Sequence, residues 1–395
     1  MNFRTYKLKD IGEVITGNTP SKSNSEFYDS KDVMFIKPDD LYIDRITMLN
    51  ESKEYLSNKG AEHARILPQG SVLVTCIGII GKVGMLKQEM AAFNQQINAI
   101  VPNKNIVNEK YLAYKIWNHR KKLQHIANAP VVPIINKRQF SDFQIEIPPI
   151  DYQLKVVDVL DKAQELIDKR KAQIEALDHL TQSVFLEMFG DPIKNTNQYK
   201  KEKLANLCIK ITDGTHHSPP TVKEGIPYIT AKHLNKGGLD FFKDPTYVSL
   251  EDHQKIYERC NPEKGDVLYI KDGATTGIAA INHYDFEFSM LSSLALIKVD
   301  FNKLNNYYLT HFLNNERVFR KITSGMNGGA IKRLTLKKIN NIEVVVPPIE
   351  LQNQFAEIIK KIEIQKELLQ KSLEELENNF NSLMQRAFKG ELFND

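Results

Sequence analysis

The feature that most constrains this chain is an internal repeat with an offset of 199 residues. The segment PPIDYQ at residues 148–153 returns as PPIELQ at residues 347–352. Similarity at one fixed offset indicates that a single structural unit is written twice along the chain. The 395 residues are enough to bury more than one hydrophobic core, so each copy can fold around its own.

A long amphipathic helix is predicted after each Pro-Pro pair. Proline suits the first helical turn, and the acidic residue close behind it suits the helix dipole. Each stretch runs about 36 residues without proline or glycine, or roughly 54 Å, until Gly190 with Pro192 or Gly390 stops it. Apolar residues alternate at spacings of 3 and 4, as in a coiled-coil seam. The predicted seam residues are Val156, Leu160, Ile167, Ile174, Leu177, Val184, Phe355, Ile359, Ile362, Leu369, Leu373, Leu376, Phe380 and Leu383. The alternative is that each helix only packs on its own domain.

Weaker landmarks match in the domain before each helix. The apolar runs at 35–37 and 228–230 predict strands, and the segments 67–73 and 261–268 each predict a turn that feeds a strand. Glycine-rich exits follow at 78–84 and 273–279. The loop at 212–220 has no good counterpart near residues 17–22, which predicts different loops on a shared scaffold.

These patterns predict an α+β fold with a pseudo-twofold internal repeat. Two similar globular α/β domains are separated by two long antiparallel helices that form a coiled coil. The predicted boundaries are 1–149 for the first domain, 150–189 for the first helix, 190–348 for the second domain, 349–388 for the second helix and 389–395 for a C-terminal tail.

Two similar heads held apart by a rod suit a long, regular ligand with near-twofold symmetry. Duplex DNA has that symmetry, and paired recognition elements on one side of it lie roughly 34–36 Å apart.

The formal net charge of +4 is too small to indicate nucleic-acid binding unless the cations cluster. The cysteines Cys76, Cys208 and Cys260 lack the spacing of redox pairs or zinc ribbons, which favours a reducing cytoplasm. Neither a signal peptide nor a membrane span is predicted.

The ordered set of motifs resembles the specificity subunit of a type I restriction-modification system, over essentially the whole chain. The motifs are the paired Pro-Pro-Ile-acid-x-Gln helices, the Gly-Asp-Val-Leu strand at Gly265, FGDP at 189–192 and AFKGEL at 387–392. The resemblance implies two target recognition domains, each reading one half of a bipartite double-stranded DNA site, with the helices as spacer. It also implies that the helices dock modification (methyltransferase) subunits, two of them, and through these restriction subunits. No membrane partner is implied.

The resemblance further implies a cytoplasmic, non-catalytic chain that binds no cofactor and no metal of its own. S-adenosylmethionine, with ATP and Mg²⁺ for restriction, is expected on the partner subunits. The residues agree, because each Pro-Pro pair follows Ile147, Ser218 or Val346 rather than the Asn or Asp of a methyltransferase motif. A phosphate-binding Gly-x4-Gly-Lys-Ser/Thr loop is also missing from the sequence.

Two alternative functions stay open. Asp39, Glu51 and Lys53 have the residue types of a Pro-Asp…Glu-x-Lys nuclease site, although such a loose pattern often arises by chance. The chain could also be a coiled-coil scaffold that joins other proteins without reading DNA. DNA binding that weakens with salt would separate a DNA reader from a scaffold.

Candidate DNA contacts are polar residues in loops and near glycines. Phosphates require lysine, arginine and backbone donors, and base edges require side chains that donate or accept hydrogen bonds at close approach. Glycines let the backbone approach a strand, but they are equally typical of hairpin turns. The candidates are Thr19, Ser21, Lys22, Lys82, Gln95, Gln96, Lys137 and Arg138 in the first domain, and Thr215, His216, His217, Lys232, Lys271, Thr275, Thr276, Lys332 and Arg333 in the second.

Overall fold

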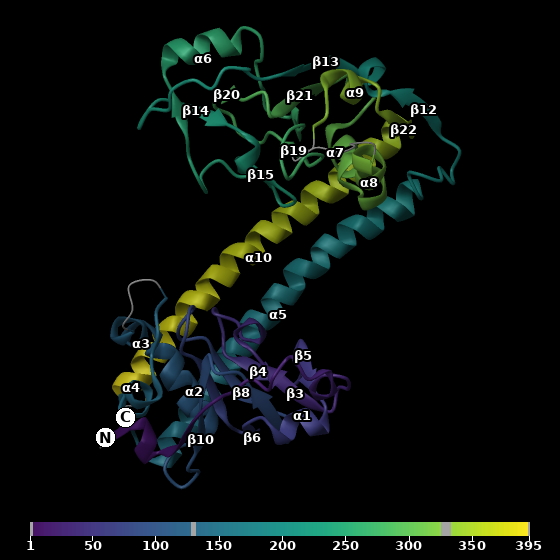
Figure 1. Cartoon of the computed structure of the whole chain (residues 1–395). Helices are drawn as coiled ribbons and strands as arrows, with labels where there is room; N and C mark the ends of the chain where they lie inside the picture. The colour runs from purple at the N-terminus through teal and green to yellow at the C-terminus, as the bar shows by residue number, and fades with distance from the viewer. Residues whose placement is uncertain (1–2, 128–131, 325–332, 394–395) are drawn as a thin grey trace. The chain divides into compact units, whose positions relative to one another are not determined.

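The computed structural model describes residues 3–127, 132–324 and 333–393. The chain divides into two units, residues 1–170 with 372–395 and residues 171–371. The division passes through both long helices, α5 (Ile150–Phe189) and α10 (Ile349–Lys389), which Figure 1 labels with the other elements.

The first unit is built on two sheets. One has the strand order β2-β10-β7-β8-β4 and the other β5-β3-β9-β6, while β1 pairs with β11. The run Val72–Thr75 is buried on both faces, which places β7 inside its sheet. The strands are β1 (Arg4–Lys7), β2 (Gly12–Thr16), β3 (Val33–Ile36), β4 (Thr47–Leu49), β5 (Glu54–Leu56), β6 (Ile66–Pro68), β7 (Val72–Thr75), β8 (Val83–Leu86), β9 (Met90–Phe93), β10 (Ile97–Pro102) and β11 (Gln144–Ile147). The helices are α1 (Asn58–Glu62), α2 (Glu109–Asn118), α3 (Arg120–Ile126) and α4 (Lys137–Ser141).

The second unit repeats most of this topology; its described sheets lack strands equivalent to β4 and β6 and include a further pair, β15 with β16. The order β13-β21-β18-β19 corresponds to β2-β10-β7-β8, the order β17-β14-β20 corresponds to β5-β3-β9, and β12 pairs with β22 as β1 does with β11. The mixed pairing is also repeated, because β14 is antiparallel to β17 and parallel to β20. The strands are β12 (Lys200–Lys203), β13 (Cys208–Asp213), β14 (Ile226–Ile229), β15 (Leu234–Asn235), β16 (Gly238–Leu239), β17 (Tyr247–Val248), β18 (Val267–Ile270), β19 (Ala279–Ile281), β20 (Ser289–Met290), β21 (Leu294–Val299) and β22 (Glu343–Val346). The helices are α6 (Leu250–Tyr257), α7 (Asn306–Asn314), α8 (Glu316–Ser324) and α9 (Leu336–Asn340).

The predicted strands and turns are found in both copies. The two predicted strands lie in β3 and β14, and the two predicted turns feed β7 and β18. Both glycine-rich segments are the connections of antiparallel hairpins, β7–β8 and β18–β19. Gly78 and Gly273 have φ of 76° and 115°, a region that glycine adopts at little cost, so the hairpin interpretation is confirmed.

The prediction that the loop at 212–220 lacks a counterpart near residue 17 is wrong for the backbone. Gly17 and Gly214 end equivalent strands, and a Cβ at either would lie 2.2 Å or 2.0 Å from a backbone oxygen. Asn18 and Thr215 then donate their backbone N–H groups to carbonyls of β9 and β20, at 3.1 Å and 2.8 Å. The two loops therefore start from the same place and differ in side chains.

The glutamine of each repeat motif anchors the start of a long helix. Gln153 donates from Nε2 to the carbonyls of Pro148 and Ile106, and its Oε1 accepts the N–H of Asn108, at 2.8, 3.0 and 2.8 Å. Gln352 repeats the three bonds at 2.8, 3.3 and 2.8 Å. Both glutamines are fully buried, so the motif ties the helix to the loop before α2 or α7.

The long helices end at glycines, as predicted, since Gly190 and Gly390 have φ of 72° and 79°. Each predicted seam residue is buried or half-buried. Within the second unit, the Phe185 ring lies 5.7 Å from that of Phe355, near the start of α10. Asp178, earlier in α5, pairs with Lys366, later in α10, at 2.5 Å. The two helical stretches inside this unit therefore run antiparallel.

Among the residues that the structure describes, every helix is too short or too polar to traverse a lipid bilayer.

Candidate nucleic-acid interface

In both units, a distant segment returns to the end of the strand that precedes the glycine-rich hairpin. In the first unit, Ile134 forms a backbone bridge with Ile77, which follows β7. In the second unit, Arg333 forms the same bridge with Asp272, which follows β18. Because Lys271 precedes Asp272 in the chain, this bridge brings Arg333 close to Lys271. The two predicted contact residues are far apart in the sequence, and nothing in the sequence links them.

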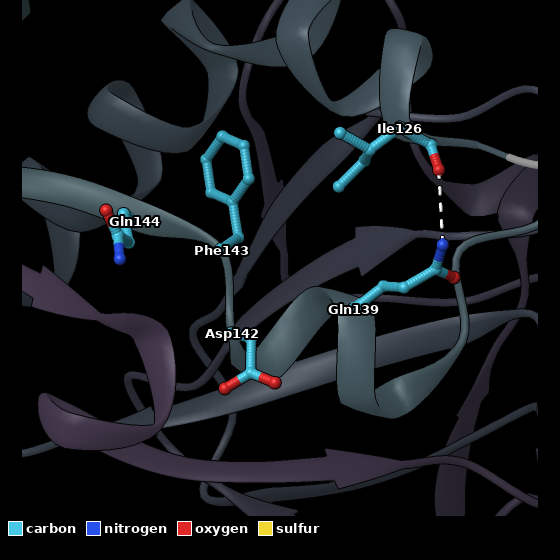
Figure 2. A pocket seen from close by; sticks show the side chains of 5 residues that line it. All are labelled: Ile126, Gln139, Asp142, Phe143 and Gln144. Carbon is cyan, nitrogen blue, oxygen red and sulfur yellow. Dashed lines mark hydrogen bonds between the residues drawn. The ribbon is translucent and has the colours of Figure 1, made fainter.

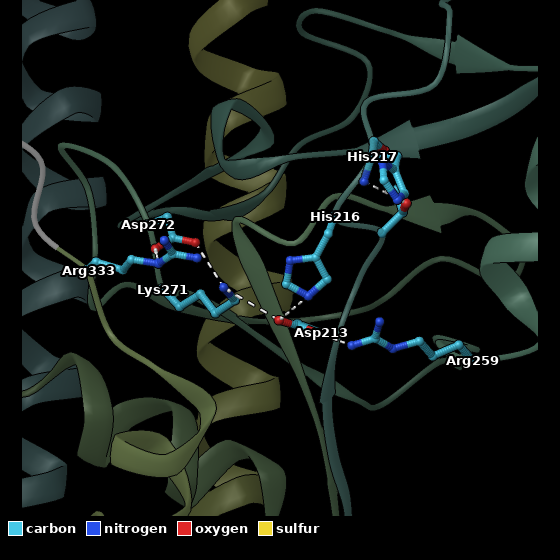
Figure 3. A network of polar contacts seen from close by, with 8 residues as sticks. Asp213, His216, His217, Arg259, Lys271, Asp272 and Arg333 are labelled. Atoms are coloured by element: carbon cyan, nitrogen blue, oxygen red, sulfur yellow. Dashed lines mark hydrogen bonds and ion pairs between the residues drawn. The ribbon is translucent and has the colours of Figure 1, made fainter.

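A network of charged residues surrounds Asp213 in the second unit, as Figure 3 shows. The Asp213 carboxylate lies 2.7 Å from Arg259 Nη2, 3.3 Å from His216 Nε2 and 3.5 Å from Lys271 Nζ. The side chains of Asp213 and Lys271 are each 3% exposed. Arg259 and His216 extend outward from this buried centre, with 55% and 48% of their side chains exposed.

A second carboxylate continues the network to the surface. Lys271 Nζ lies 2.8 Å from Asp272 Oδ2, and Asp272 Oδ1 lies 3.0 Å from Arg333 Nε. The cations of this network are Arg259, Lys271 and Arg333, and its carboxylates are Asp213 and Asp272. The net charge of these five residues, not counting His216, is therefore +1. Two carboxylates therefore hold two arginines and a histidine at the protein surface: Arg259, Arg333 and His216.

Two predicted contact residues of the second unit are buried. Lys271 is enclosed between two carboxylates, and Thr276 donates its hydroxyl to the Gly273 carbonyl at 2.7 Å. The prediction that these two residues contact DNA directly is therefore wrong, because neither side chain reaches the surface. Lys271 instead supports the network.

The other predicted residues of the second unit lie outside its strands and α-helices, with Lys232 in a short 3-10 helix at Ala231–His233. Thr215 donates its hydroxyl to the carbonyl of His217 at 3.0 Å, and Thr275 is exposed in the hairpin. Lys232 pairs with Asp244 at 2.9 Å. The predicted Lys332 lies outside the described residues.

The candidates of the first unit gather less tightly. Thr19 and Gln95 come together, with the threonine hydroxyl 2.5 Å from Gln95 Oε1, although they are far apart in sequence. Lys82 donates from Nζ to the Pro38 carbonyl at 2.9 Å, so it is held against the protein. The remaining candidates show no shared cluster: Gln96 is half-buried, whereas Ser21, Lys22, Lys137 and Arg138 are exposed.

Several functional candidates were missed by sequence reasoning. Asp213 and Asp272 were not predicted because acidic side chains were not expected to contact phosphates or base edges, and no sequence pattern links Arg259 to either. In the first unit, Arg120 begins the basic helix α3, which lies against the glycine-rich hairpin, because Gln124 Nε2 donates to the Ile80 carbonyl at 3.2 Å. The three consecutive basic residues of that helix were the available signal.

A surface pocket recurs at the same place in both units. The first has a volume of about 480 Å³, and Gln139 closes one side by donating to the Ile126 carbonyl at 3.3 Å (Figure 2). The second, of about 580 Å³, includes Lys338, Asn341, Ile342 and Glu343, which match lining residues 139 and 142–144 of the first at the offset of 199. The pocket therefore belongs to the shared scaffold rather than to one unit.

The described residues contain no group of three or more histidine, cysteine, aspartate or glutamate side chains that could hold a metal ion. This applies to the nuclease-like pattern of Asp39, Glu51 and Lys53, whose two acidic residues join no such group. Burial raises the pKa of each of the three cysteine thiols to about 12, so these thiols stay protonated at neutral pH.

The comparisons with known proteins agree with one another. The sequence model of a family described as "Type I restriction modification DNA specificity domain" matches residues 1–176 and again 198–378. The Type I restriction enzyme MjaIX specificity subunit of Methanocaldococcus jannaschii is 25% identical, over 90% of this chain and 85% of that protein. The putative MjaX specificity subunit of the same organism is 23% identical, over 99% and 94%.

Solved structures show the same fold. The S subunit of a type I restriction-modification system from M. genitalium superposes with a TM-score of 0.58 at 14% identity, over 100% of this chain and 97% of that one. A chain solved in work on complex assembly and conformational transition of the type I R-M system gives 0.61 at 17% identity, over 99% and 98%.

Proposed function

Because the chain belongs to the type I restriction-modification DNA specificity family, we propose that it is the DNA-reading, non-catalytic subunit of such a system. Each unit reads one half of a bipartite site in double-stranded DNA. The long helices form a coiled coil that sets the distance between the two halves. The complex works in the cytoplasm.

The observation that carries this proposal is one scaffold with two different surfaces. Where the first unit places Ile77 and Ile134, the second places Asp272 and Arg333 at the same backbone bridge. Base pairs are distinguished by the donors, acceptors and methyl groups on their edges, so different side chains on one framework suit different sequences. A single contiguous target would not require two such surfaces.

The long helices also offer a docking surface for modification subunits. Leu166, Leu180, Ile364 and Leu368 lie on α5 and α10 with 46% to 62% of each residue exposed. Apolar side chains at such exposure are typical of protein interaction sites when they share an element. We propose that two modification subunits bind there, and that restriction subunits join through them.

The chemistry of methylation and cleavage then belongs to the partners. Modification subunits would bring S-adenosylmethionine, and restriction subunits would bring ATP and Mg²⁺. The role of this chain is to hold a DNA sequence in place for those enzymes.

Genome-wide methylation mapping in a host with and without this chain tests the proposal. We expect methylated adenines or cytosines to appear in one motif made of two short defined blocks separated by a spacer of any sequence. The modification subunits without this chain should leave the same sites unmethylated. A single uninterrupted motif would contradict the two-reader proposal.

The exposed apolar residues on the long helices also favour the second candidate, a scaffold that joins proteins without reading DNA. A filter-binding titration of the assembled complex against salt separates the two. For a DNA reader, the logarithm of the binding constant falls linearly with the logarithm of salt concentration, in proportion to the phosphates neutralised. A scaffold would show no such slope.

A further inference from the structure

We infer that Arg333 reads a guanine in the half-site contacted by the second unit, and that Asp272 is the positioning residue that orients it. This inference rests on the proposed function and names the base that the charged network would recognise.

The guanidinium of Arg333 presents a donor pair. Its side chain is 64% exposed, whereas that of Asp272 is 21% exposed. The Nε atom of Arg333 lies 3.0 Å from Asp272 Oδ1, on the inner edge of a guanidinium that is otherwise largely exposed. The donor pair of a guanidinium matches the N7 and O6 acceptors of guanine in the major groove.

The position of Arg333 is set by its backbone, and its side chain forms an ion pair with Asp272. Its backbone bridges that of Asp272, and the next N–H, of Leu334, donates to the Lys271 carbonyl at 2.7 Å. The Asp272 carboxylate is held in turn by Lys271 Nζ at 2.8 Å. A donor pair that is ordered before binding loses less conformational entropy when it meets a base.

The charges favour a base over a phosphate as the ligand of Arg333. Asp272 lies against the guanidinium, and its negative charge would repel a phosphate group that approached the same side chain. The N7 and O6 atoms of guanine are uncharged acceptors and meet no such repulsion.

The first unit serves as an internal control for the structural role of these charges. It forms the same backbone bridge with Ile77 and Ile134, so the fold does not need an ion pair at this place. A carboxylate that is mostly buried costs desolvation free energy, and apolar residues in its place are often as stable or more so. The ion pair of the second unit is therefore explained by a ligand rather than by stability.

The test is methylation mapping with the chain assembled with its modification subunits, comparing wild type with Arg333→Ala and Arg333→Lys. We expect both variants to keep the first half-site and the spacer. At one G·C position of the second half-site they should lose roughly 10- to 100-fold of the preference for guanine. Arg333→Lys should not restore it, because lysine cannot donate bidentately.

The double variant Asp272→Ile with Arg333→Ile copies the first unit and should fold while losing the same preference. Arg320→Ala, another exposed arginine of this unit, is the matched control and should leave the motif unchanged. Unchanged specificity in Arg333→Ala, or methylation lowered equally at every site, would overturn the inference. Failure of the proposed function would look different, because the wild-type complex itself would give no two-block motif.

Discussion

At the residue scale, the repeat motif is explained by its buried glutamines. The sequence shows that Gln153 and Gln352 recur at one offset, and the structure shows three hydrogen bonds for each. Each side chain satisfies two carbonyls and one N–H where the chain turns from a strand into a long helix. A shorter side chain would leave these groups unpaired.

Gln352→Ala should therefore lower the free energy of unfolding by about 2–3 kcal/mol, because three buried polar partners lose their hydrogen bonds. Gln354→Ala is the matched control, since Gln354 is exposed on the next turn, and it should change stability by less than about 0.5 kcal/mol. Urea denaturation followed by circular dichroism measures both. Equal stability of the two variants would show that the glutamine bonds contribute little.

The charged network around Asp213 shows that the role of one charged side chain depends on the side chains around it. Lys271 looked like a DNA contact because it follows a strand near glycines, yet Asp213 and Asp272 enclose it. Arg333 forms an ion pair with one of these carboxylates, that of Asp272. A lysine's role here depends on which acids the fold places beside it.

At the element scale, the long helices show two kinds of apolar side chain. Ile362 is buried in the core of the second unit with Phe355 and Ile359. Ile364, two residues later, is 62% exposed, as is Leu368 one turn further on. The heptad pattern predicts the first set, and the second set lies outside it, so the helices carry more apolar surface than their own packing uses.

The two positions should respond differently to the same substitution. Ile362→Glu should destabilise the protein by about 3 kcal/mol or more, because a charge replaces a core contact. Ile364→Glu should leave thermal stability within about 0.5 kcal/mol, yet weaken capture of the modification subunits in a pull-down assay. Normal capture by a folded Ile364→Glu variant would argue against docking on this part of α10.

At the scale of the whole molecule, the duplication separates what is shared from what differs. Strand order, the parallel and antiparallel pairings, the anchored helix starts and the surface pocket are shared by both units. The loops and the residues at the backbone bridge differ. Because the two units share a scaffold and differ in their surface residues, we expect each unit to act on DNA independently of the other.

Exchanging residues 1–149 for the first domain of another family member tests this independence. We expect one half-site of the methylation motif to change and the other to stay as it was, because the second unit keeps all its own contacts. The reciprocal exchange of residues 190–348 should change only the other half. A change of both halves after either exchange would contradict modular reading.

The sequence by itself determined the duplication, the two long helices with their glycine stops, and the strands before the glycine-rich hairpins. These features depend on local periodicity and on residues with restricted or unusual backbone freedom, which one sequence displays directly. The shared start of the loops after Gly17 and Gly214 was not readable, because equivalent backbone paths carry unrelated side chains there.

Only the tertiary structure decided which charged residues meet. Asp213, Arg259, Lys271 and Arg333 come from four separate parts of the chain, and their contacts arise from strand pairing and from a returning segment. Burial likewise turned Lys271 and Thr276 from surface candidates into internal supports. Helices and strands can be predicted from the sequence because they depend on patterns within a few residues. The charge and exposure of a site depend on neighbouring residues that lie far away in the sequence.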